Sequence, residues 1–162
     1  MKKLTFTLLL IGAIAFCSCG DKVLLDETRT FDRETWLRFQ PEQYELTPQS
    51  TDDCYNFIIT ATIDTSRFRE AGLPIMLEID NSNHENRTLF ATLLLRNHNG
   101  NWMGTVDENG NLVVTQMVRQ FFFFSSTTPH TIKLGQRTSK YEIHGIRSIN
   151  FKVEKAKVVY PE

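Results

Sequence analysis

The chain has 162 residues and a formal net charge of −1 at pH 7. This length fits one domain, which can bury roughly two-thirds of its unfolded surface and so hold a core without disulfides or metals. Nothing in this charge balance suggests nucleic-acid binding, which needs a strongly basic face.

The first 18 residues have the pattern of a secretory signal peptide. Two lysines precede an apolar run from Leu4 to Phe16, and the small residue Ser18 follows. The run is shorter than the roughly 20 residues of a membrane-spanning helix, so we interpret residues 1–18 as a cleaved leader. Without the leader the chain has 144 residues and a net charge of −3, because the two lysines are lost.

Cys19, directly after the leader, resembles the lipidated cysteine of a bacterial lipoprotein. Ser18 fits the usual pattern before such a cysteine, whereas Cys17 is a poorer acceptor because the bulky Phe16 precedes it. Gly20 rather than aspartate follows Cys19, which favours the outer membrane. The sequence therefore predicts a lipid-anchored protein of the cell envelope, and a secreted protein cut near Ser18 is the alternative.

The rest of the chain is divided into a tether and a folded domain. Residues 19–30 are polar and acidic, and we predict that they form the lipidated N-terminus and a tether, with the domain over residues 31–162. Apolar and polar residues then alternate with the period of strands that have one face in water. The predicted strands lie at 44–47, 55–63, 75–80, 89–95, 131–134 and 149–154.

Two features refine this pattern. Residues 89–95 are apolar on both faces apart from Thr92, which predicts a central strand. The pairs Asn99-Gly100 and Asn109-Gly110 predict tight hairpin turns, because both residue types tolerate a positive φ. Short strands separated by such turns predict an all-β fold: a single antiparallel β-sandwich that is jelly-roll-like, with a barrel of the same strands as the alternative.

Four blocks of the sequence resemble the GldH family of gliding-motility lipoproteins, and their order and spacing match over most of residues 30–157. They are the lipoprotein start followed by an isolated Trp36, the strand opening Tyr55-Asn56-Phe57, the hairpin Asn99-Gly100-Asn101-Trp102-Met103-Gly104, and the closing strand from Gly145 to Lys155. The family turn has aspartate where this chain has Asn99, which preserves the turn.

The resemblance implies a β-sandwich lipoprotein of the cell envelope. It also implies an association with the gliding apparatus and with the secretion machinery that shares parts with it. It implies no active site.

No group of residues predicts catalysis, a metal or a cofactor. The four histidines, His84, His98, His130 and His144, lack the close spacing of zinc ligands. The acid pairs Asp52-Asp53 and Asp107-Glu108 are typical of solvated turns rather than of a glycosidase. Cys54 stands alone beside Asp53, which opposes thiolate formation, and we predict that it is a small buried residue at the start of a strand. The sequence contains no glycine-rich phosphate loop.

Phe121, Phe122, Phe123 and Phe124 form the most unusual run in the chain. On a strand, two of these rings point to each face. If one face is uncovered, the rings are candidates for binding a protein partner or stacking on sugars, and Trp36 has the same ambiguity. The alternative, which we favour, is a strand inside a sandwich with both faces covered.

We therefore expect a non-enzymatic, lipid-anchored envelope protein that acts as an interaction or scaffold component of a gliding or protein-secretion apparatus. Its partners would be the membrane, through the N-terminal lipid, and other envelope proteins. The alternative is a carbohydrate-binding surface lipoprotein that stacks sugars on exposed aromatic rings.

Overall fold

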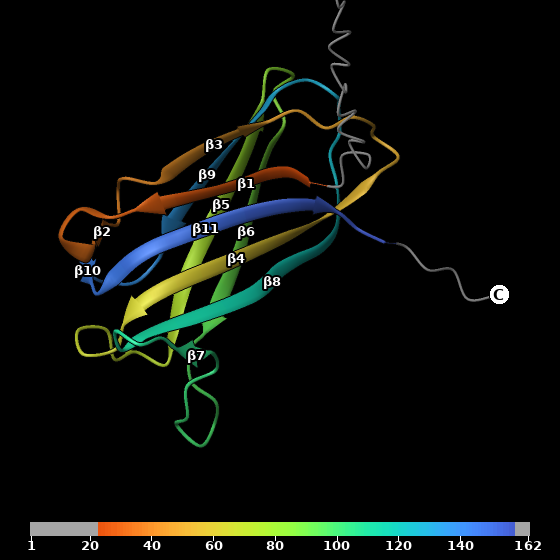
Figure 1. The fold of residues 1–162 in the computed structure, drawn as a ribbon. Coiled ribbons are helices and arrows are strands. Elements are labelled where there is room, and N and C mark those ends of the chain that lie inside the picture. Colours follow the sequence, from red (N-terminus) through yellow and green to blue (C-terminus); the bar gives the residue numbers. More distant parts are fainter. Residues whose placement is uncertain (1–22, 158–162) are drawn as a thin grey trace, which may run out of the picture.

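The structure is a computed structural model that describes residues 23–157, and in it two antiparallel sheets pack face to face (Figure 1). The predicted all-β sandwich is thus confirmed. In Figure 1, strands β5 and β6 of one sheet cross the direction of strands β4 and β8 of the other. The predicted leader at residues 1–18 and the lipidation site Cys19 lie outside the described residues.

The first sheet has five strands in the order β1-β11-β4-β8-β7. They are β1 (Val23–Thr30), β11 (Ile146–Lys155), β4 (Cys54–Asp64), β8 (Asn111–Phe123) and β7 (Thr105–Val106). The longest strands, β4 and β8, pair along most of their length, from Cys54 opposite Phe123 to Asp64 opposite Asn111.

The second sheet has four strands in the order β3-β9-β5-β6, and a separate pair is formed by β10 and β2. The four strands are β3 (Glu42–Leu46), β9 (His130–Gln136), β5 (Gly72–Asn81) and β6 (Asn86–Leu94). The small pair consists of β2 (Thr35–Leu37) and β10 (Glu142–His144), and a tight turn, η1 (Asp32–Glu34), leads from β1 into β2.

The core lies between the two sheets because each long strand buries every second side chain. Along β4, Phe57, Ile59, Ala61 and Ile63 are fully buried while the residues between them are partly exposed. The alternation predicted for this strand is confirmed, and so is the burial of Cys54 at its start.

Residues 23–30 correct the predicted tether. They form β1 and pair with β11 from Val23 opposite Glu154 to Thr30 opposite Ser148. Leu25 is buried in the core, while the polar residues that suggested a tether lie on an edge strand, where water covers one face and one edge. Residues 23–30 therefore belong to the folded domain, which does not begin at residue 31.

The expectation of a central strand at 89–95 is also wrong. Strand β6 lies at the edge of the second sheet, and its outward side chains Phe90 and Leu94 are 58% and 50% exposed. Composition misleads here because an edge strand on an open sheet face can carry apolar side chains that no second sheet covers; the Phe90 ring is covered only in part, by the Arg137 guanidinium 4.1 Å from its centroid. The Gln116 side chain caps this edge, since its amide bonds the backbone N–H and C=O of Leu94.

The two predicted hairpin turns are present. Gly100 and Gly110 have φ values of 81° and 79°, which an L side chain rarely adopts. In each turn an upstream side chain caps backbone N–H groups: Asn97 caps Asn99 and Asn101, and Asp107 caps Asn109 and Asn111. The two Asn-Gly pairs therefore predict the positions of these turns correctly.

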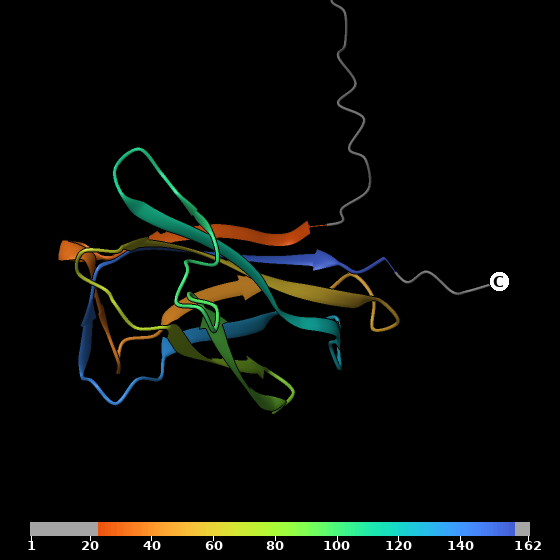
Figure 2. The same ribbon diagram turned by 90° about the horizontal axis from the view of Figure 1, so that it is seen from below.

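The long strands give the sandwich two distinct ends. We call the end formed by the start of β1, the start of β4 and the end of β8 the tether end, because Cys19 precedes Val23 by four residues. The opposite end carries η1, β2 and β10, and we call it the distal end. Figures 1 and 2 both place the start of β1 on one side and β2 on the other.

Candidate binding surfaces at the two ends of the sandwich

The phenylalanine run at the end of β8 is divided between core and surface. Phe122 and Phe124 are each 2% exposed, whereas Phe121 and Phe123 are 50% and 51% exposed. The Phe122 ring lies 4.9 Å from that of Phe57 and 5.0 Å from that of Phe124, between ring centroids. Phe122 and Phe124 are therefore core residues and not partner-binding residues, and only half of the run remains a candidate surface.

Trp36 is also a core residue. It is 1% exposed, it stacks on Phe31 with ring centroids 5.1 Å apart, and it pairs across the small sheet with the buried Ile143. Its indole fixes β2 and β10 to the body of the sandwich. Of the two alternatives for Trp36, burial excludes an uncovered ring that meets a partner, although Trp36 also lines a pocket described below.

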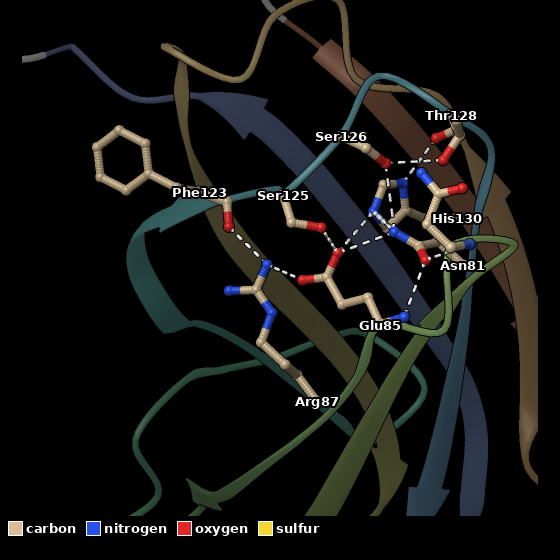
Figure 3. A network of polar contacts seen from close by, with 9 residues as sticks. Asn81, Glu85, Arg87, Phe123, Ser125, Ser126, Thr128 and His130 are labelled. Carbon is tan, nitrogen blue, oxygen red and sulfur yellow. Dashed lines mark hydrogen bonds and ion pairs between the residues drawn. The ribbon is translucent and has the colours of Figure 1, made fainter.

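A buried polar network fastens the chain that follows the phenylalanine run (Figure 3). Its centre is Glu85, whose side chain is 10% exposed and lies in the turn between β5 and β6. The Ser125 hydroxyl and the Asn81 amide both donate to Glu85 Oε2, the latter over 2.9 Å. Figure 3 shows the same carboxylate facing Arg87, with which it forms an ion pair.

His130 is the remaining member of this Glu85 network. Its Nδ1 donates to the Thr128 carbonyl over 2.7 Å, which leaves Nε2 facing Asn81 Nδ2 at 3.2 Å and Glu85 Oε2 at 3.3 Å. His130 is 1% exposed, so the ring contacts protein on all sides. The histidine links the start of β9 to the β5–β6 turn.

Arg87 connects the network to the phenylalanines. Its guanidinium lies over the Phe122 ring, 4.3 Å from the centroid, and its Nη2 donates to the Phe123 carbonyl over 2.8 Å. The cation stabilises the face of the buried ring, and the hydrogen bond fixes the backbone from which the exposed Phe123 ring projects.

The electrostatics of Glu85 follow from these contacts. Burial by itself would raise the pKa of the carboxyl, but hydrogen bonds from Ser125 and Arg87 and the charge of Arg87 outweigh it, so the pKa lies below its usual value. Glu85 is therefore an anion that its neighbours stabilise, rather than a proton donor.

The network does not have the geometry of a serine hydrolase. Nucleophilic activation requires the serine hydroxyl to bond an imidazole. Here the Ser125 hydroxyl bonds the carboxylate of Glu85, and the imidazole of His130 is enclosed. What the arrangement does is hold three segments of the chain together at the tether end.

The distal end contains an open pocket of about 570 Å³. Its lining combines two stacked aromatic rings with carboxylates, an amide and an imidazole, contributed by Thr30, Phe31, Asp32, Arg33, Thr35, Trp36, Leu37, Gln40, Glu42, Glu142 and His144. His144 Nδ1 lies 2.9 Å from the Thr35 hydroxyl, and His144 Nε2 lies 3.3 Å from Glu142. The pocket offers several hydrogen-bonding groups in a concave wall.

The rim of this distal pocket is held by ion pairs. Arg33 and Glu34 in η1 have φ values of 51° and 56°, an unusual left-handed conformation for side-chain-bearing residues. Glu34 bonds Arg67 at 3.0 Å and Arg147 at 2.9 Å, and its carbonyl accepts the Gly145 N–H. These contacts keep the turn in its strained shape.

An exposed aromatic pair adjoins the distal pocket. Phe39 and Tyr141 are 72% and 61% exposed, and their ring centroids are 6.0 Å apart with the planes tilted by 49°. Arg38 joins them: its guanidinium lies 5.5 Å from the Phe39 centroid, and its N–H donates to the Tyr141 carbonyl. Sequence reasoning missed this pair, because each ring is a single aromatic residue within a polar stretch.

No cluster of three metal-ligating side chains occurs within residues 23–157. The four histidines lie in different parts of the domain. His84 and His98 are exposed in loops, His130 is buried at a strand start, and His144 lines the distal pocket. No helix in that part of the chain combines the length and apolar character needed to cross a membrane.

Comparison with known proteins gives no relative: no family model, no curated protein and no solved structure matches the chain. Function is therefore inferred from the residues of this chain alone.

Proposed function

We propose that the protein is a non-enzymatic, lipid-anchored component of the cell envelope that holds a rigid β-sandwich at a membrane and presents its distal end to an envelope protein. The proposal keeps the expectation of a scaffold role in a gliding or protein-secretion apparatus, which the resemblance to gliding-motility lipoproteins supports. It adds an orientation, in which the lipid anchor is at the tether end and the partner-binding surface is at the distal end.

The observation that carries the proposal is that the start of β1 and the exposed aromatic pair lie at opposite ends of the sandwich. Cys19 precedes β1 by four residues, whereas Phe39 and Tyr141 lie beyond the other end of β1. Exposed aromatic residues next to a concave, polar wall are typical of surfaces that bind another protein. A protein anchored at the tether end would expose this surface to the surrounding compartment.

A carbohydrate ligand is the second candidate. The distal pocket favours it, because Asp32, Glu42, Glu142 and Gln40 could bond sugar hydroxyls. The aromatic pair argues against it, because rings tilted by 49° cannot both lie flat against one sugar ring. The two rings are already in contact with each other, so a protein side chain packed against their exposed outer faces fits this geometry better.

The anchor is tested by the variant Cys19→Ala. We expect the protein to leave the membrane fraction while the domain keeps its fold, because the lipid is the only proposed attachment that the substitution removes. Continued membrane association of a folded Cys19→Ala protein contradicts the lipid anchor.

The distal surface is tested by affinity capture from envelope extracts with the lipidated protein as bait. The double variant Phe39→Ala/Tyr141→Ala should lose the proteins that the unaltered chain captures. The control Phe90→Ala, which removes a 58% exposed ring elsewhere, should retain them. Capture of sugar polymers without any envelope protein would favour the carbohydrate alternative.

A further inference from the structure

The tether end carries an exposed apolar surface in line with the start of the domain. Phe121 and Phe123 are about half exposed, and Val23 is 42% exposed. Val23 lies opposite Glu154 across β1 and β11, and Glu154 lies opposite Asn56 across β11 and β4. The Asn56 side chain then accepts the Phe121 N–H over 3.3 Å. Val23 and Phe121 thus lie in one row across four strands, at the same end of the sheet.

Covalent geometry places the proposed lipid close to this row. Val23 is the fourth residue after Cys19, and an extended chain spans at most about 3.5 Å per residue, so the two Cα atoms are within about 14 Å whatever path the chain takes. Three strand spacings, also about 14 Å, separate Val23 from Phe121. The Cα atoms of Cys19 and Phe121 are therefore at most about 28 Å apart, which lets acyl chains on Cys19 and the exposed phenylalanines reach the same membrane surface.

The rings are presented by a rigid backbone. Arg87 bonds the Phe123 carbonyl, and Glu85 bonds both Arg87 and Ser125 on the other side of Phe123. The neighbouring Phe122 and Phe124 are locked in the core. Because the segment is already ordered, burial of the two exposed rings in a second phase requires little further loss of conformational freedom.

Phe121 itself is conformationally unusual. Its φ is 50°, in the left-handed region that bulky side chains rarely adopt. Such strain persists only where the surroundings enforce it, and it is concentrated at functional positions. Here it accompanies an irregular register between β4 and β8 near Phe57, which leaves Phe121 and Phe123 exposed on either side of the buried Phe122.

The charges next to the rings do not oppose an anionic membrane. Asp53 is paired with Lys155 at 2.6 Å, and Glu154 with Lys152 at 2.7 Å. Arg119, two residues before Phe121, is exposed. Asp52, in the loop that precedes β4, is also exposed. Anionic lipid attracts Arg119 and repels Asp52, and the other charges are paired, so the surface beside the rings carries no net charge that hinders approach.

We propose that Phe121 and Phe123 insert into the interface of the membrane that holds Cys19, so that the bilayer surface covers this apolar patch and the distal end points away from it. The inference rests on the lipid anchor proposed above and adds a second, non-covalent contact. Lipid attachment and an inserted apolar surface together hold a domain in one orientation, which a flexible lipid tether by itself does not.

The test uses a nitroxide label as a depth reporter on the lipidated protein, purified from membranes and reconstituted into phosphatidylethanolamine–phosphatidylglycerol vesicles. Cys19 carries the lipid and Cys54 is buried, so a cysteine introduced by Thr51→Cys, in the exposed loop that precedes β4, is the accessible thiol. A second reporter, Tyr141→Cys, marks the distal end.

We expect the label at position 51 to be at least about tenfold less accessible to a water-soluble nickel complex than the label at 141, because the apolar area of two inserted rings favours the docked orientation. The double variant Phe121→Ser/Phe123→Ser should abolish the difference, and the ring control Phe90→Ser should not. Equal accessibility at 51 and 141, or an equal loss in Phe90→Ser, overturns membrane docking.

Three outcomes separate the two proposals. A mass spectrum of the purified protein without lipid on Cys19 overturns the anchor and the docking with it. Lipid on Cys19 with an exposed label at 51 overturns only the docking. Protection at 51 that appears without vesicles, together with dipolar broadening between labels, shows that a second copy covers the rings and also overturns it.

Discussion

The two ends of the sandwich both expose aromatic rings, but they hold them in different ways. At the tether end, Phe121 and Phe123 project from β8, a strand of 13 residues in the main sheet, and the Glu85 network fixes the backbone at the Phe123 carbonyl and at Ser125. At the distal end, Phe39 and Tyr141 flank a sheet of two three-residue strands, whose link to the core is Trp36 and Ile143.

Because of this difference, we expect substitutions at the two ends to affect the stability of the fold to different extents. A two-stranded sheet is marginal by itself, so the distal end depends on a few buried side chains and can open locally without unfolding the body. At the tether end, buried and exposed phenylalanines alternate over four consecutive residues. Substitutions there therefore compare the stability contributed by a core ring with that contributed by a surface ring next to it. Each of the following predictions sharpens or breaks this contrast.

The largest effect is expected for Phe124→Ala. Its ring is 2% exposed and contacts the rings of Tyr55, Phe122 and His130. Removal of such a ring leaves a cavity and lowers the free energy of unfolding by about 3–5 kcal/mol. Phe123→Ala, the neighbouring exposed ring, should lower it by less than about 1 kcal/mol. Urea denaturation of both variants measures the difference, and equal losses would refute the division of the run between core and surface.

The next effect is expected for Glu85→Gln. The substitution keeps the shape but removes the charge that Arg87 and Ser125 face, so the free energy of unfolding should fall by about 1.5–3 kcal/mol. Glu34→Gln at the distal end, where the partners are more exposed, should cost about 1 kcal/mol or less. A larger loss for Glu34→Gln than for Glu85→Gln would reverse the proposed order of rigidity.

The same carboxylate predicts a pH dependence. Because the folded-state pKa of Glu85 lies below the ordinary value of 4.5, the unfolded chain binds this proton more readily than the folded chain does. The stability that ionised Glu85 contributes is therefore complete above pH 4.5 and is lost as the pH falls through the lower, folded-state pKa. Thermal unfolding between pH 6 and pH 3 should show a smaller decline in Glu85→Gln than in the unaltered chain; parallel curves would contradict this.

The smallest effect on stability is expected for Phe39→Ala/Tyr141→Ala. Both rings are largely exposed, so the free energy of unfolding should change by less than about 1 kcal/mol while capture of the envelope partner is lost. The thermal midpoint and the capture experiment can be measured on the same preparation. A large stability loss would show that the pair supports the fold of β2 and β10 and is not a free recognition surface.

The sequence anticipated the elements that depend on local pattern. Alternation at 55–63 identified β4, because a strand with one face in the core has a period of two. Asn99-Gly100 identified a turn, because glycine tolerates the positive φ that the turn requires. The burial of Cys54 followed from its position at the start of an apolar strand. These features are decided within a few residues of the chain.

The candidate surfaces were anticipated only in part. Phe121–Phe124 pointed to an unusual position, but alternation alone could not say which rings the core would take. The distal pocket was missed apart from Trp36, because its lining comes from the β1–β2 turn, β3 and β10, which no sequence spacing connects. Glu85 and His130 are 45 residues apart and share no motif.

By itself, then, the sequence determined the all-β class and the principal turns, since both depend on side chains close together in sequence, while the lipid anchor at Cys19 stays a prediction. The tertiary structure decided that residues 23–30 are an edge strand and not a tether, that β6 is an edge and not a centre, and that Phe121 and Phe123 face outward while Phe122 and Phe124 fill the core. The physical reason is that exposure depends on which strand lies alongside and which sheet lies opposite, and both are set by contacts between distant segments of the chain.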